Sequence, residues 1–170
     1  RTPGRAPVLC KPTAKAYELL RDGQTVKSEA WVVIKNRLLE VFERIKHHNQ
    51  DQAIQQLLVE MPSVNMPVLS GAYTIALLAA HANRPGGPGR EVVDDCIELA
   101  ARPEQALSLF AGAVLSSMAR VKGSLYEQVA SYVHRFHRDI LKLTAQERRL
   151  LVSFLQQVLE KMSARGWVCG

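Results

Sequence analysis

The feature that most restricts the fold of this chain is a succession of helix-length amphipathic segments with no alternating strand pattern between them. In the segment from Trp31 to His48, apolar residues recur at steps of three and four, as they do along one face of an α-helix. Further segments begin near residues 50, 70, 90, 103, 124 and 145. The chain is therefore predicted to be all-α, with about seven to eight amphipathic helices in antiparallel pairs.

Particular residues set the expected helix boundaries. Gly23 is expected to end a short first helix that begins at residue 13, and Ser28 is expected to cap the second helix. Pro103 suits the first turn of a helix, where its missing N–H would have no partner anyway. Two capping boxes, each a Ser or Thr followed three residues later by Glu, are predicted to open the last two helices: Ser124 with Glu127, and Thr144 with Glu147.

The segment from Arg90 to Ala101 is predicted to be a helix with an apolar inner side and an acidic outer side. The residues predicted to point inward are Val92, Val93, Cys96, Ile97 and Ala100. Those predicted to point outward are Glu91, Asp94, Asp95 and Glu98. These acidic residues follow helical spacing and lack the glycine turn of a calcium-binding loop, so a solvated face is expected there.

The spacing of the helices resembles that of helical-repeat proteins. Two helices per step make a unit of about forty residues, close to the HEAT and armadillo repeats, although the interval from 90 to 103 breaks the rhythm. Residues 70–101 also resemble the paired helices of tetratricopeptide and pentatricopeptide repeats, through Tyr73, Leu77, Ala80, Cys96 and Ala100. The resemblance implies an irregular helical repeat, and a compact helical bundle is the alternative.

The 170 residues fit one domain. We expect a flexible N-terminal segment over 1–12, an all-α domain over 13–166 with a Pro/Gly linker at 84–89, and a tail over 167–170. The chain has no initiator Met, which is typical of a piece of a larger protein. No uninterrupted apolar stretch is long enough to cross a bilayer, so no membrane association is expected. Three cysteines without a close pairing favour free thiols in a reducing compartment, cytoplasmic or nuclear.

The pattern of histidines and cysteines does not indicate an enzyme. His134 and His137 are three residues apart and could share a helix face, but a structural zinc site needs about four ligands and no cysteine pair lies nearby. Cys96 lies on an apolar stripe and is expected in the core. No catalytic residue, metal or cofactor is therefore predicted.

A basic region near the last two helices is the main candidate for partner binding in a chain of net charge +6. Cations there are interleaved with rings, and the candidate residues are Arg120, Lys122, Tyr132, His134, Arg135, His137, Arg138, Lys142, Arg148 and Arg149. We expect a non-catalytic scaffold domain that binds an acidic helix or peptide of a protein partner. Single-stranded RNA is the alternative, because cations bind phosphates and rings stack on bases.

A second candidate surface is the broad apolar arc of the segment from Trp31 to His48. Beside its main stripe it carries further apolar residues, and the candidate contacts are Trp31, Val32 and Leu39. A broad arc indicates either burial between two neighbours or an exposed strip that meets a partner. Homodimerisation through this arc is the third hypothesis.

Overall fold

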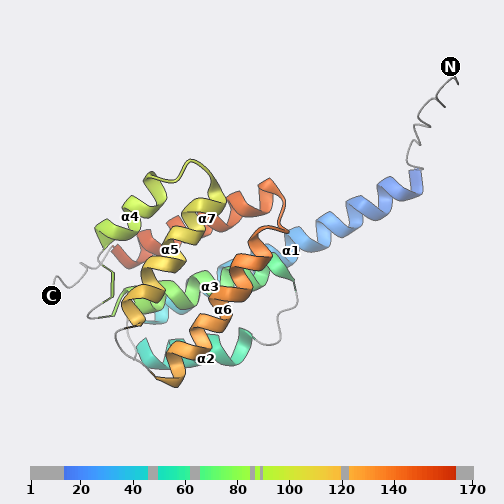
Figure 1. Cartoon of the computed structure of the whole chain (residues 1–170). Helices are drawn as coiled ribbons and strands as arrows, with labels where there is room; N and C mark the ends of the chain where they lie inside the picture. Colours follow the sequence, from blue (N-terminus) through green and yellow to red (C-terminus); the bar gives the residue numbers. More distant parts are fainter. Residues whose placement is uncertain are drawn as a thin grey trace, which may run out of the picture. The chain divides into compact units, whose positions relative to one another are not determined.

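The computed structural model of the chain confirms the all-α class (Figure 1). It describes residues 14–45, 50–61, 66–84, 87–88, 90–119 and 123–163. Within these ranges there are seven helices and no strand. The helices are α1 (Ala14–Ile45), α2 (Gln50–Glu60), α3 (Pro67–Ala82), α4 (Arg90–Glu98), α5 (Pro103–Met118), α6 (Ser124–Ile140) and α7 (Ala145–Ser163).

The chain divides into two units, Arg1–Val33 and Ile34–Gly170. The helix α1 continues through the boundary without a break, so the helix end predicted at Gly23 and the cap predicted at Ser28 are wrong. A glycine inside a helix costs only about 1 kcal/mol relative to alanine. That cost is too small to end a helix when good helix formers such as Ala, Leu, Glu and Lys stand on both sides.

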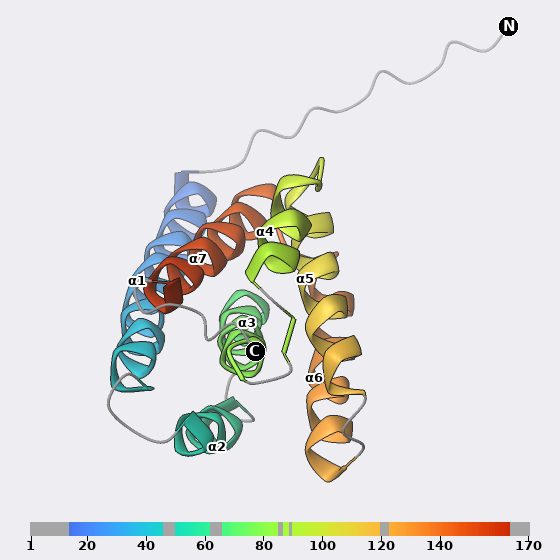
Figure 2. The same cartoon turned by 90° about the vertical axis from the view of Figure 1, so that its left-hand side faces the viewer.

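The second unit is built around α3, which is seen nearly end-on at the centre of Figure 2. Every residue from Val68 to Ala82 is buried, and α3 packs against α2, α5, α6 and α7. The helix contains no Asp, Glu, Lys or Arg and is apolar on all sides, which is typical of a helix enclosed by others. Its buried Thr74 hydroxyl is satisfied internally, since it donates to the Ser70 carbonyl at 2.9 Å.

Gly71 lets α6 and α7 approach α3 closely. A Cβ at this position would lie 2.9 Å from Leu151 Cδ1 on α7 and 3.3 Å from Phe136 Cε2 on α6. Both neighbours are themselves buried, so neither can move away freely. The absence of a side chain at Gly71 therefore sets the separation of three helices.

This arrangement bears on the choice between a repeat and a bundle. A central helix covered by four others is typical of a compact helical bundle. The helix α4 packs on α5. The forty-residue repeat stays a prediction, because no contact within the described residues establishes it.

The helix ends show which start signals the fold uses. Glu147 Oε2 accepts a hydrogen bond from Thr144 N at 2.8 Å, and Thr144 Oγ1 accepts one from Glu147 N at 3.2 Å, which confirms this capping box. Pro103 opens α5 as predicted. The box at Ser124 is wrong, because Gly123 is the N-cap of α6 and no side chain caps that end. A neighbouring residue with a suitable extended backbone has taken the capping position.

Candidate functional site

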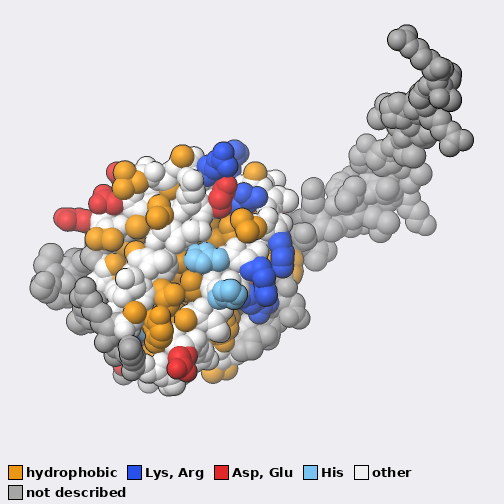
Figure 3. All heavy atoms as spheres, in the orientation of Figure 1, with side chains coloured by type: hydrophobic (Ala, Val, Ile, Leu, Met, Phe, Trp, Pro, Cys, Tyr) orange, Lys and Arg blue, Asp and Glu red, His pale blue; other side chains and the backbone are white. Residues whose placement is uncertain are grey.

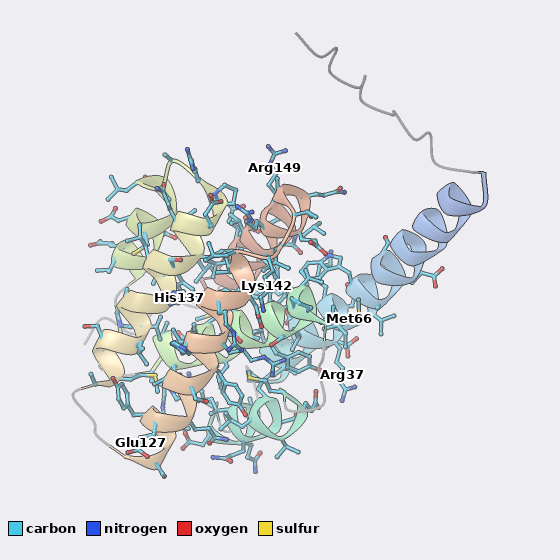
Figure 4. The ribbon with its side chains drawn as sticks, turned by 45° about the vertical axis from the view of Figure 1, so that its right-hand side comes forward. Arg37, Met66, Glu127, His137, Lys142 and Arg149 are labelled. Carbon is cyan, nitrogen blue, oxygen red and sulfur yellow. The ribbon has the colours of Figure 1, made fainter. Side chains whose placement is uncertain are left out.

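The candidate site lies on α6 and on the turn that joins it to α7. The buried residues Val129, Val133, Phe136 and Ile140 hold α6 against the core, so the remaining face is left to polar side chains. Figure 4 shows Glu127 near one end of α6 and Lys142 just beyond the other. The cations of this surface lie toward the C-terminal end, where positive charge also complements the helix dipole.

Asp139 organises the cations at this end of α6. Its buried carboxylate lies 3.2 Å from Lys142 Nζ, 3.5 Å from Arg135 Nε and 4.0 Å from Arg138 Nε. A carboxylate near a helix C-terminus is unfavourable by itself, so these cations compensate it. Arg138 and Lys142 nevertheless keep 63% and 61% of their side chains exposed, which leaves both able to meet a partner.

Arg148 and Arg149 are adjacent in the sequence but differ in environment. Arg148 donates from Nε and Nη2 to the Leu143 carbonyl at 3.1 and 2.9 Å, and its Nη1 lies 3.1 Å from Glu104 Oε2 on α5. The backbone N–H of Glu104 itself and the charge of Arg148 lower the pKa of that carboxyl. Arg149 is exposed and points away from the fold (Figure 4). Arg149 alone of the two is available to a partner.

An exposed leucine lies in the sequence between the exposed cations Arg138 and Lys142. Leu141 follows the last residue of α6 and is 75% exposed. It lies one position past the buried stripe that ends at Ile140, which turns its side chain outward by about 100°. We call Arg138, Leu141, Lys142 and Arg149 the basic corner.

The rings proposed for this surface are only partly accessible. His134 is exposed, whereas Tyr132 and His137 are half-buried. His137 Nε2 is buried and finds no hydrogen-bond partner among the described residues. Figure 3 shows the two surface histidines beside the Lys and Arg side chains over α6.

The other predicted contacts do not join this surface. Arg120 and Lys122 lie outside the described residues. Of the apolar set, Trp31 is buried, Leu39 is half-buried and Val32 is exposed. At the basic corner, exposed cations and an exposed leucine therefore coincide.

A second polar cluster lies away from the basic corner and links three helices. Glu60 of α2 accepts hydrogen bonds from Arg37 of α1 at 2.7 Å and from Tyr73 of α3 at 3.0 Å. Burial raises the pKa of Glu60, but the hydrogen bonds from Gln56, Tyr73 and Arg37 outweigh it and the pKa is lowered. Burial and the neighbouring carboxylate raise the pKa of Tyr73. All these groups have hydrogen-bond partners within the cluster, so we assign the cluster a structural role in joining the three helices.

The described residues show neither a metal-binding cluster nor a helix that could span a membrane. They contain no group of three or more His, Cys, Asp or Glu side chains placed to hold a metal ion. In the same ranges, no helix has the length and hydrophobicity needed to span a bilayer. Cys96, predicted in the core, is half-buried, and burial followed by the charge of Asp95 raises the pKa of its thiol.

Two residues of this site, Asp139 and Leu141, were not among those predicted from the sequence. Asp139 looked like one acidic residue among cations, and its role depends on burial that only the packed structure shows. Leu141 left a readable signal, because it is a large apolar residue off the apolar stripe and is followed directly by Lys142.

No protein-family model, curated protein or solved structure matches this chain. The function must therefore be inferred from the side chains of the surface itself.

Proposed function

We propose that this chain is a non-catalytic helical scaffold domain that binds an acidic, amphipathic segment of a protein partner at the basic corner. One observation carries the proposal, namely the exposed Leu141 between the exposed cations Arg138 and Lys142. An apolar anchor supplies most of the affinity of such a contact, and the surrounding charges supply orientation and association rate. An intracellular partner protein would fit the free thiol of Cys96.

The composition of the corner favours a protein over RNA. Stacking of bases needs exposed rings, and the large exposed apolar side chain at the corner is an aliphatic leucine. Of the rings in the predicted set, Tyr132 and His137 are half-buried and His134 is exposed. Binding of single-stranded RNA through the same cations remains the competing hypothesis, which the experiment below separates.

The test is fluorescence anisotropy with two labelled probes, titrated with the 170-residue chain across a salt series. One probe is a helical peptide with leucines on one face and glutamates on the other, and the second is single-stranded oligouridine. We expect the peptide to bind with a dissociation constant in the micromolar range. For RNA, log affinity would fall against log salt by about 0.7 per phosphate contacted.

Matched variants locate the site. Arg138→Gln with Lys142→Gln should weaken peptide binding by about tenfold. The control, Gln128→Glu with Ser131→Glu, changes the net charge equally at exposed positions of the same helix and should leave binding within about twofold. Leu141→Ser should weaken peptide binding by about fivefold or more. The control Val59→Ser, which removes a similarly exposed apolar side chain from α2, should leave peptide binding unchanged.

Two results would contradict the proposal. Peptide binding that is unchanged by both the charge variant and Leu141→Ser would place the site elsewhere. Tight RNA binding that Leu141→Ser does not affect, together with no peptide binding, would favour the RNA hypothesis.

A further inference from the structure

The helix α4 has an acidic stripe on its exposed side. Glu91, Asp95 and Glu98 follow steps of four and three residues, which places them along one side of the helix. All three are exposed, and none has a basic partner among the described residues. Unlike the carboxylate of Asp139, these carboxylates are therefore free to meet cations of another molecule.

Exposed apolar side chains accompany this stripe. Val92, which was predicted to point inward, is 48% exposed, and Leu99 is 81% exposed. They are seven residues apart and so lie on the same side of the helix. The Leu99 backbone N–H donates to the Asp95 carbonyl at 2.9 Å, which extends the helical turn past Glu98. The other side of α4 faces the core, and Val93 on that side is completely buried.

We call Glu91, Val92, Asp95, Glu98 and Leu99 the acidic face. Its chemistry is the complement of the basic corner. Its three carboxylates are opposite in sign to the charges of Arg138, Lys142 and Arg149. Each of the two surfaces also presents an exposed leucine. In Figure 3 acidic side chains gather at the edge over α4, whereas basic side chains lie over α6 on the other side of that view. Because the two surfaces are apart within one folded unit, they can meet only between molecules.

We propose that the acidic segment bound by the basic corner is the acidic face of a second copy of this chain. This inference rests on the proposed function and names its partner. The contact is heterologous, since two different surfaces meet, so copies associate head to tail rather than as a closed symmetric pair. Each surface is small and charged, so the association is weak, depends on concentration and weakens with salt.

The test is sedimentation velocity of the 170-residue chain over a concentration series at low and at high salt. At low salt we expect the weight-average mass to rise above that of the monomer as concentration increases. Raising the salt concentration to about 0.5 M should weaken this association by about fivefold or more. A mass that stays monomeric at every concentration at low salt would overturn the proposal.

Charge exchange identifies the surfaces. The triple variant Glu91→Lys, Asp95→Lys and Glu98→Lys should be monomeric, and so should Arg138→Glu with Lys142→Glu and Arg149→Glu. A mixture of the two variants should associate again, because each then presents the charge that the other lacks. Association that persists in the α4 variant would overturn the proposal, even if the second variant proves unable to fold.

The acidic peptide separates this inference from the function on which it rests. The α4 variant keeps its basic corner, so it should bind the peptide as the unmodified chain does. Peptide binding without self-association would reject only the second-copy partner. If the unmodified chain neither binds the peptide nor associates with itself, the proposed function is rejected as well.

Discussion

Arg148 donates two hydrogen bonds to the main-chain carbonyl of Leu143, at 3.1 Å from Nε and 2.9 Å from Nη2. Leu143 lies in the turn between α6 and α7, where carbonyls have no partner within a helix. The same guanidinium reaches Glu104 on α5. Arg148 thus fixes the turn that carries Leu141 and Lys142, and gives the basic corner its shape.

The two neighbouring arginines should therefore separate stability from binding. Arg148→Ala should lower the free energy of unfolding by about 1 to 3 kcal/mol, since it leaves a carbonyl and a carboxylate without their charged donor. Arg149→Ala should change stability by less than about 0.5 kcal/mol, because Arg149 is exposed, but should weaken binding of the acidic peptide. Urea unfolding and peptide titration of both variants check this. Equal losses of stability would contradict it.

The two predicted capping boxes offer a second matched pair. Thr144→Ala removes a cap that the structure shows and should cost about 1 kcal/mol. Ser124→Ala alters the same motif where Gly123 is the N-cap, so stability should stay within about 0.3 kcal/mol. Urea unfolding midpoints of the two variants measure the difference. A loss at Ser124 as large as that at Thr144 would show that α6 is capped by its serine.

The same substitution at two helical glycines should have different effects. Alanine in place of glycine favours a helix by about 1 kcal/mol, and at Gly112 a Cβ would meet no atom within 4 Å. At Gly71 the new Cβ would press on Leu151 and Phe136. We expect Gly71→Ala to be less stable than Gly112→Ala by about 1 to 3 kcal/mol. Thermal or urea unfolding of the pair tests this, and equal stabilities would mean that α6 and α7 are free to shift.

His81 should make stability depend on pH. Its side chain is buried, and Nε2 has no partner within the described residues. Burial lowers its pKa to about 4, and the charge of Arg84 adds to this shift while Asp51 opposes it. The folded state thus keeps His81 neutral while the unfolded chain takes up a proton below its ordinary pKa of 6.5. Stability contributed by neutral His81 is present above that value and is lost as pH falls toward 4.

The expected loss from His81 between about pH 7 and pH 4.5 is about 2 to 3 kcal/mol. Urea unfolding of the unmodified chain and of His81→Leu at both pH values measures it. Over this interval, His81→Leu should lose less stability than the unmodified chain. The control His134→Leu, which changes an exposed histidine, should lose as much stability as the unmodified chain. An equal loss in His81→Leu would show that other groups cause the acid sensitivity.

Much of the helical content could be predicted from local patterns, because a helix end depends on a few neighbouring residues. Pro103 and the pair Thr144 and Glu147 act where the sequence places them. Gly23 and Ser124 carry similar signals that the structure does not use. A start or stop signal lowers the free energy of one helix end by about 1 kcal/mol, so a competing neighbour can override it.

The candidate site was predictable in composition but not in geometry. The cations of α6 were evident, yet Arg148 and Arg149 look alike until packing brings Glu104 and the Leu143 carbonyl to only one of them. The exposure of Val92 was likewise hidden, because its place on an apolar stripe does not reveal how few neighbours α4 has. Long-range packing decides both cases, and it leaves no trace in local spacing.

Backbone amide chemical shifts of the isotope-labelled chain, recorded while the acidic peptide is added, test the central claim most directly. We predict that the largest changes cluster at Arg138, Leu141, Lys142 and Arg149, and that amides near Glu127 at the other end of α6 stay unchanged. Changes that cluster on another surface, or that are absent at peptide concentrations near saturation in the anisotropy titration, would contradict a binding site at the basic corner.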